Sequence, residues 1–261
     1  MVKCVKDQLD REVYVNVPAQ KIISLVPSQT ELLFDLGLEK EVIGVTKFCD
    51  EPRELTKTRI KVGGTKNVNL SKILSLRPDL ILANKEENLK EDMEKLAEEV
   101  PVWVSDVSDL DSAWNMIEQV GRLTGKKKMA RTLTDMIRHS FSNLYFRREL
   151  KVVYFIWKAP YMVAGGDTFI NFMLKKCGFV NLFASFMRYP TVTFEEIRQL
   201  NPDLILLSSE PYPFRENHLP EFQQLCPSAN VLLVDGKMFS WYGSRLKYAA
   251  DYFRRLRGAI D

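Results

Sequence analysis

The sequence has few of the residues that mark metal and redox chemistry. It holds only two histidines, His139 and His218, and four cysteines: Cys4, Cys49, Cys177 and Cys226. The cysteines form no CxxC pair and have no neighbouring histidine, which argues against a zinc site or a thioredoxin-like motif. We expect most of them to be buried thiols, and their even number permits disulfides without requiring any. The histidines fall in different halves of the chain, so no metal site of several imidazoles is expected.

Long apolar runs and a dominant charge of one sign are also missing. No stretch approaches the roughly 18 apolar residues that cross a bilayer, so we expect no membrane span. The formal charge is +3 and the signs are interspersed, which argues against a nucleic-acid partner. Residues 1–17 mix charges with single apolar residues and contain no secretory signal. We therefore expect a cytoplasmic protein, unless a leader was removed, in which case it is periplasmic or lipid-anchored.

Sequence motifs of catalysis are absent as well. The first apolar strand runs into Pro27-Ser28-Gln29 without the glycines of a dinucleotide-binding turn. No phosphate-binding GxxxxGK[ST] loop, GxSxG elbow or HExxH helix occurs. We expect a protein that is not an enzyme and has no resident cofactor or metal. An α/β enzyme with unmarked catalytic residues stays an alternative.

Short β-rich apolar runs alternate with amphipathic segments along the whole chain. The runs are Ile22–Val26, Leu80–Ala83, Val100–Val104, Val152–Trp157, Leu204–Leu207 and Val231–Val234. Such alternation predicts an α/β fold with parallel sheets covered by helices. Ser28, followed three residues later by Glu31, predicts a capping box for the first helix, and Gly37 predicts its end.

An internal repeat relates the two halves. Residues 70–82 recur as residues 194–206, at a constant offset of 124 residues, and each copy reads as a helix, a Pro-Asp turn and a strand. Proline stops the helix, and aspartate can bond to the local backbone. The repeat predicts two similar Rossmann-like lobes.

The segment between the repeats predicts one long helix. Residues 126–148 contain no proline or glycine, and apolar residues recur there at helical spacing. The apolar residues are Met129, Leu133, Met136, Ile137, Phe141, Leu144 and Tyr145. The helix would be roughly 35 Å long and would bridge the lobes as a rigid rod. We therefore predict an N-terminal α/β lobe over residues 1–125, the bridging helix over 126–148 and a C-terminal α/β lobe over 149–261.

The order of these elements resembles the helical-backbone class of periplasmic binding proteins, the receptors for ferric siderophores, haem and cobalamin that serve ABC importers. The matching pieces of the first half are residues 21–31, Val42–Thr46, Cys49–Pro52, Val62–Gly64 and Pro78–Ile81. Those of the second half are Gly165–Phe169, Cys177–Asn181 and Pro202–Ile205. The resemblance implies a ligand cleft between the lobes, where the loops that follow the strands face each other.

Ligand-binding candidates are the residues that follow the strands. In the first half they are Pro27, Ser28, Gln29, Phe48, Thr65, Lys66, Asn84 and Lys85. In the second half they are Trp157, Tyr161, Arg188, Tyr189, Phe239, Trp241, Tyr242 and Arg245. Aromatic rings stack on a ring-bearing ligand and arginines pair with its negative groups. Ser28 can equally be a helix cap, and the aromatic residues can simply pack under neighbouring loops.

Two departures from the family bear on function. Family members that dock on a transporter carry a glutamate at the start of the repeated helix in each lobe; this chain has Glu195 in the second half but Ser71, followed by Lys72, in the first. Cobalamin binders place tryptophans near the positions of Thr65 and Asn84, so an anionic metal chelate such as a ferric siderophore or haem is favoured over a corrinoid. We predict a monomeric substrate-binding protein of an ABC importer, with the permease as partner. A cytoplasmic carrier or sensor is the alternative.

Overall fold

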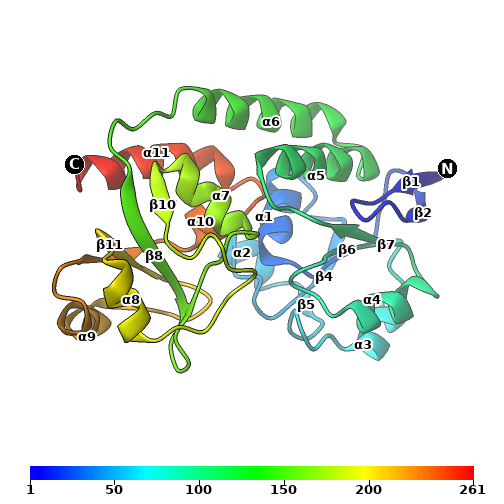
Figure 1. The fold of residues 1–261 in the computed structure, drawn as a ribbon. Coiled ribbons are helices and arrows are strands. Elements are labelled where there is room, and N and C mark those ends of the chain that lie inside the picture. Colours follow the sequence, from blue (N-terminus) through cyan, green and yellow to red (C-terminus); the bar gives the residue numbers. More distant parts are fainter. The chain divides into compact units, whose positions relative to one another are not determined.

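The computed structural model describes residues 1–261. It divides into two compact units, drawn in Figure 1. Unit 1 comprises Met1–Ile137 and Tyr242–Arg245, and unit 2 comprises Arg138–Trp241 and Leu246–Asp261. Each unit contains one mainly parallel sheet with covering helices, which confirms the predicted α/β class with two lobes.

The sheet of unit 1 has the order β5-β4-β3-β6-β7, and all its strand pairs are parallel. Its strands are β3 (Ile22–Ser24), β4 (Val42–Val45), β5 (Ile60–Lys61), β6 (Leu80–Asn84) and β7 (Val102–Ser105). Its helices are α1 (Pro27–Asp35), α2 (Arg53–Thr56), α3 (Leu70–Ser75), α4 (Lys90–Ala97) and α5 (Leu110–Leu123). In Figure 1, α1 and α5 lie on one face of the sheet and α3 and α4 on the other.

Two-sided coverage explains why these strands are apolar at consecutive positions. Ile23 and Ile81 point to one face and pack with Ile73 of α3. Their neighbours Ile22 and Leu80, on the opposite face, are also fully buried. A parallel strand with helices on both faces needs apolar side chains on both, which is the pattern that predicted these strands.

Before this sheet the chain forms an antiparallel hairpin that the sequence analysis did not predict. Strand β1 (Val2–Lys6) pairs with β2 (Glu12–Asn16), and Val13 and Val15 are buried beneath it. Asp10, with a φ of 60°, helps the chain turn back. The alternation Glu-Val-Tyr-Val-Asn in β2 is the period-two pattern of a half-buried strand, so the signal was present.

The sheet of unit 2 has the order β10-β8-β11-β12, with parallel pairing, and β9 adds to β8 antiparallel. Its strands are β8 (Leu150–Trp157), β9 (Met162–Val163), β10 (Phe179–Asn181), β11 (Leu204–Ser208) and β12 (Asn230–Val234). Its helices are α7 (Phe169–Lys176), α8 (Phe194–Leu200), the short 3-10 turn η1 (Glu216–His218), α9 (Leu219–Leu225), α10 (Lys237–Ser240) and α11 (Leu246–Gly258). The strands predicted in both halves are therefore confirmed, within two residues at their ends.

The predicted repeat is confirmed as two equivalent helix–turn–strand units, α3-β6 and α8-β11. Asn69 caps α3 by accepting a hydrogen bond from Lys72 N, and Thr193 caps α8 by accepting one from Glu196 N. The turn acids do not bond to their own turns. Asp79 accepts from Lys21 N just before β3, at 2.8 Å, and Asp203 accepts from Lys151 N in β8, at 2.7 Å. Each acid ties its turn to the start of the neighbouring central strand.

The capping box predicted for the first helix is wrong. The N-cap of α1 is Val26, with Pro27 in the first turn, and no side chain caps the helix. Ser28 therefore lies inside the first turn. Proline suits that position because its missing N–H has no helical partner there in any case. Gly37, with a φ of 70°, does follow the end of the helix as predicted.

The long helix between the halves is shorter than predicted. Helix α6 spans Lys127–Ser142, about 24 Å at 1.5 Å per residue, so residues 143–148 are not helical. The chain passes from unit 1 to unit 2 inside α6, after Ile137. Ile137 and Phe141 are buried, but Met129, Met136 and Tyr145 are exposed. The apolar stripe is therefore narrower than the sequence spacing indicated.

Candidate functional site

In unit 1, the loops that follow the strands gather at one edge of the sheet. The chain runs outward from β3 to β4 and β5 and then returns to β6 on the other side of β3. Open α/β sheets bind ligands outside the carboxyl ends of the strands at such a reversal. The candidates predicted in the first half all lie at this edge, Asn84 as the last residue of β6 and the others after strands: Pro27, Ser28, Gln29, Phe48, Thr65, Lys66 and Lys85.

Two of these candidates belong to a buried hydrogen-bond network. Gln29 donates from Nε2 to Ser105 Oγ at 2.5 Å, and Asn84 donates from Nδ2 to the same oxygen at 3.0 Å. Asn84 Oδ1 also accepts from Glu86 N and fixes the turn after β6. Gln29 and Asn84 are almost fully buried. They hold α1, β6 and β7 in register at this edge.

Ser28 is buried as well, whereas Phe48, Lys66 and Lys85 are exposed. Phe48 is 53% exposed, and Lys47 Nζ lies 5.0 Å from its ring centre. Lys66 donates from Nζ to Glu86 O at 2.6 Å, and Lys85 forms an ion pair with Asp106 at 2.6 Å. This edge therefore exposes one aromatic ring, Phe48, together with several lysines, and Lys66 and Lys85 are held by contacts to Glu86 and Asp106.

Tyr242 and Arg245 were predicted to act from the second half, but they pack on unit 1. Arg245 donates to both carboxylate oxygens of Glu31, at 2.5 and 3.1 Å, and Tyr242 donates to Glu87 Oε1 at 3.0 Å. Between them, Gly243 approaches the carbonyl of Ser28 so closely that an added Cβ would lie 2.5 Å from its oxygen. The segment 242–245 is thus built onto the start of α1.

The Glu31–Arg245 pair is a buried, two-pronged ion pair. The Glu31 side chain is 12% exposed and that of Arg245 15%. Burial raises the pKa of Glu31, and the Arg245 guanidinium opposes that rise. Planar two-point contact of this kind fixes the arginine precisely. Sequence reasoning found Arg245 but not its acidic partner, because Glu31 had been assigned to a helix cap.

In unit 2 the chain reverses in the same way on either side of β8. It passes from β8 to β10 and then to β11 on the opposite side. The second-half candidates in this unit are Trp157, Tyr161, Arg188, Tyr189, Phe239 and Trp241, and they follow β8, β10 and β12. The carboxyl edge of this sheet is therefore the counterpart of the edge in unit 1.

Tyr161 and Trp157 lie at the end of β8 in different surroundings. Tyr161 donates to Glu221 Oε1 at 2.5 Å, while Lys158 forms an ion pair with Glu221 Oε2, also at 2.5 Å. Burial, followed by the bond to Glu221, raises the pKa of Tyr161 to about 12. The two bonds lower the pKa of Glu221. Trp157 is 39% exposed and packs edge-on against Tyr212.

Trp241 is held by a buried carboxylate that the sequence analysis did not identify. Trp241 donates from Nε1 to Glu210 Oε1 at 2.8 Å, and Ser240 donates from Oγ to the same oxygen at 2.8 Å. Burial raises the pKa of Glu210. Phe239 is fully buried and packs against Tyr154 and Phe253. Trp241 and Tyr242 are buried too, so the aromatic run packs in the interior and, contrary to the stacking role predicted from the sequence, exposes no ring.

Two exposed apolar residues beside Arg188 were also missed. Phe186 is 50% exposed and Met187 69%. Their backbone is held by hydrogen bonds from Gly165 N to Arg188 O and from Gly166 N to Phe186 O, at 2.8 and 2.7 Å. The backbone of the loop after β10 is thus fixed in place while Phe186 and Met187 stay exposed, which makes both further candidates for ligand contact.

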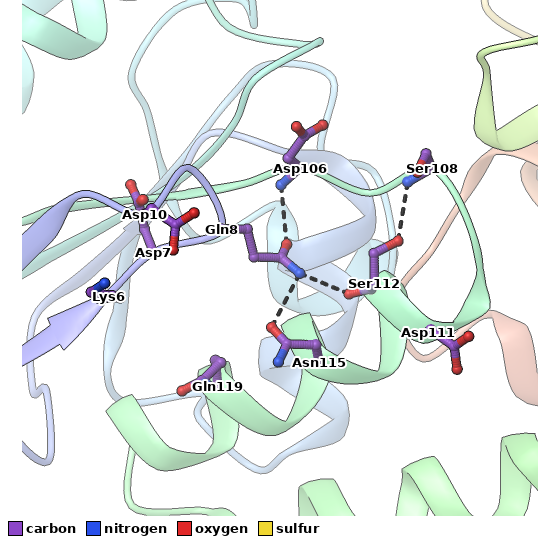
Figure 2. Close-up of a pocket in the computed structure, with 10 residues that line it drawn as sticks. All are labelled: Lys6, Asp7, Gln8, Asp10, Asp106, Ser108, Asp111, Ser112, Asn115 and Gln119. Carbon is purple, nitrogen blue, oxygen red and sulfur yellow. Dashed lines mark hydrogen bonds between the residues drawn. The ribbon is translucent and has the colours of Figure 1, made fainter.

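A cavity of about 570 Å³ lies elsewhere in unit 1, between the turn of the hairpin and α5 (Figure 2). Gln8 crosses it: Nε2 donates to Ser112 O and Asn115 Oδ1, and Oε1 accepts from Asp106 N. Figure 2 shows these bonds converging on Gln8. They fasten the hairpin to α5 and to the end of β7, which gives this cavity a structural explanation.

The structure contains no group of three or more His, Cys, Asp or Glu side chains placed to hold a metal ion. None of the helices combines the length and apolarity that crossing a bilayer requires. The four cysteines are unpaired, and all except Cys4 are buried, as expected.

Comparison with known proteins decides the family. A family model described as periplasmic binding protein matches residues 22–225, which is most of both units. The chain belongs to the periplasmic binding protein family. The resemblance seen in the sequence is therefore confirmed.

Relatives within the family share both sequence and fold with this chain. An uncharacterized ABC transporter substrate-binding lipoprotein, YvrC, of Bacillus subtilis is 31% identical over 214 residues, covering 77% of this chain and 68% of that protein. A vitamin B12-binding protein of Vibrio campbellii is 29% identical over 201 residues, covering 75% and 73%. The periplasmic haem-binding protein RhuT of Roseiflexus sp. RS-1 superposes with a TM-score of 0.81 at 20% identity, covering 93% of this chain and 100% of that one.

The site residues of this periplasmic binding protein stay predictions, and their surroundings can be tested directly. Replacing Arg245 by alanine should lower the free energy of unfolding by about 3 kcal/mol, because it leaves the Glu31 carboxylate buried without a cation. Urea unfolding measures the loss. The double variant Glu31→Gln, Arg245→Ala should recover part of it, since no buried charge remains. A double variant no more stable than Arg245→Ala would contradict the buried-pair explanation.

The raised pKa of Glu210 predicts a specific pH dependence. The folded protein holds this proton more tightly than the unfolded chain, whose glutamates titrate near about 4.3. Protonated Glu210 therefore contributes its full stabilisation below the pKa of the unfolded chain. This stabilisation is lost as the pH rises through the pKa of Glu210 in the folded protein. Glu210→Gln keeps the acceptor for Trp241 and Ser240, so its unfolding free energy should fall less between pH 5 and pH 8. Glu99→Gln is the exposed control, and identical pH profiles for Glu210→Gln and wild type would refute the prediction.

Proposed function

We propose that this protein binds a small ligand without changing it chemically and delivers it to an ABC-type importer. The observation that carries the proposal is that a member of the periplasmic binding protein family presents candidate side chains at the carboxyl edges of both sheets, where this class of fold places ligands. The expected ligand groove stays a prediction. We propose no resident cofactor and a monomeric protein.

The chemistry of the two edges favours a metal complex: an anionic chelate such as a ferric siderophore or haem, or else a corrinoid. Phe48, Trp157 and Phe186 are partly exposed aromatic rings at these edges. Lys66 and Arg188 supply positive charge beside them. Rings contribute stacking area and cations pair with carboxylates, as a chelate of this kind requires. The relatives named for vitamin B12 and haem are consistent with such a ligand.

The proposed partner is the permease of an ABC transporter, and the proposed location is periplasmic or lipid-anchored. A relative 31% identical to this chain is named as a substrate-binding lipoprotein of an ABC transporter. Ligand binding and docking on the permease are separate proposals, and each has its own test below.

The proposed docking surface is the start of helix α8. Glu196 is occupied in the capping box with Thr193, whereas the side chain of the adjacent Glu195 is 69% exposed. In α3 the matching residue is Ser71, which donates to Asn69 Oδ1 at 2.9 Å. No acid lies in the first turn of α3. Docking is therefore proposed to depend on Glu195 more than on the equivalent position of α3.

Ligand binding is tested by thermal shift with haemin, cyanocobalamin, a ferric hydroxamate and molybdate. A ligand at 100 times its Kd should add about 2.7 kcal/mol of stability. The variant Phe186→Ala, Met187→Ala should weaken that binding at least tenfold, because both side chains sit on the fixed loop of the site. The control Met129→Ala, Met136→Ala removes two exposed apolar side chains from α6 and should bind like wild type. If none of the four ligands stabilises the protein, the proposal fails.

Docking is tested with the purified permease complex in proteoliposomes. Glu195→Lys should reduce ligand uptake at least fivefold while ligand affinity stays unchanged, because charge complementarity at the permease is reversed. Lys72→Glu, which places an acid in the first turn of α3, should increase uptake. Unchanged uptake with Glu195→Lys would remove α8 from the docking surface.

A further inference from the structure

A second groove in unit 1 has an apolar floor and a cationic rim. It has a volume of about 510 Å³, within the range of about 300–1,000 Å³ typical of small-ligand sites. Its lining comes from the hairpin, α5 and the start of α6: Lys3, Val5, Lys6, Val17, Gln119, Arg122, Leu123 and Lys127. In Figure 1 the hairpin of β1 and β2 lies beside α5.

The rim of this groove gathers four cationic side chains, of which Lys6 lies opposite Glu12 in the hairpin. Lys3, Lys6, Arg122 and Lys127 are all exposed, and the lining includes no aspartate or glutamate. No ion pair of the structure involves any of these four side chains. Like charges that line one groove repel one another, and a bound anion would relieve the repulsion.

The floor of the groove is apolar because of the register of the hairpin. Lys3 pairs with Val15 and Val5 with Val13, so these residues share the hairpin face that also includes Val17. Val13 and Val15 are buried, whereas Val5 and Val17 are half-buried and line the groove with the buried Leu123. Lys3 is the cation in an otherwise valine-lined face. Its alkyl stem can lie along that face while its ammonium reaches the rim.

We infer that this groove binds an anionic amphiphile: an acyl chain on the valine and leucine floor, with its carboxylate or phosphate held by the rim. A purely polar anion would leave the floor uncovered, and a neutral acyl chain would leave the four cations unpaired. The groove shares no residue with the candidate ligand edges. The inference therefore does not depend on the proposed function.

The test uses dodecanoate below its micellar concentration, measured by calorimetry on the full-length chain. Dodecanoate should bind at least tenfold more tightly than dodecylammonium, which has the same chain and the opposite charge. Lys3→Glu, Arg122→Glu should weaken dodecanoate binding at least tenfold. The control Lys40→Glu, Lys57→Glu changes the net charge equally at two other exposed positions of unit 1 and should stay within twofold of wild type.

A second arm distinguishes the source of the amphiphile. Co-sedimentation with vesicles of phosphatidylcholine and phosphatidylglycerol, lost in Lys3→Glu, Arg122→Glu, would identify a phospholipid headgroup; binding of dodecanoate alone would identify a free fatty acid. Val5→Ser should weaken binding of either source through the floor and leave the melting temperature nearly unchanged. The inference is overturned if neither dodecanoate nor the vesicles bind, if dodecylammonium binds equally well, or if the Lys3 and Arg122 reversals have no more effect than the control.

Discussion

Both sheets are buried on both faces, and this constraint determines where polar chemistry can occur. A strand such as β6 is fully buried along its length and its backbone pairs with β3 and β7, so polar side chains are confined to its ends. At the amino ends, Asp79 and Asp203 accept hydrogen bonds from the backbone at the start of β3 and β8. The carboxyl ends are then left for the loops on which the ligand-binding side chains are predicted. Asp79 and Asp203 occupy matching positions of the sequence repeat, so the repeat places the same hydrogen bond in both units.

Buried carboxylates are the second element of this design. Glu31 holds Arg245 in unit 1, and Glu210 holds Trp241 in unit 2. Each acid follows the carboxyl end of a strand, β3 or β11, and each fixes a side chain predicted to contact ligand. Burying a carboxylate destabilises its charged form, as the raised pKa values of both acids indicate. What the chain gains is a positioned side chain, which lowers the ordering cost of binding.

The sequence predicted features that depend on local pattern. The strands β3, β6, β7, β8, β11 and β12 followed from apolar runs, the repeat from a constant offset, and the end of α1 from one glycine. The cap of α1 did not, because Ser28 and Glu31 match a capping box while Pro27 occupies the first turn. The bridging helix was predicted to be too long. The absence of proline and glycine permits a helix beyond Ser142 but does not require one. Acidic partners such as Glu210 were missed because only tertiary contacts bring Trp241 and Ser240 to it.

The groove beside the hairpin and the candidate ligand edge of unit 1 are two separate surfaces of one unit. Its lining comes from β1, from Val17 after β2, and from residues at the end of α5 and the start of α6, whereas the ligand edge of unit 1 comes from loops after strands. Occupants of the two surfaces would therefore not compete for any side chain. Any coupling would have to pass through the hairpin and the ties of Gln8 to Asp106 and Ser112. Those ties reach the end of β7, two strands from the chain reversal at β3, so the two surfaces are expected to bind independently.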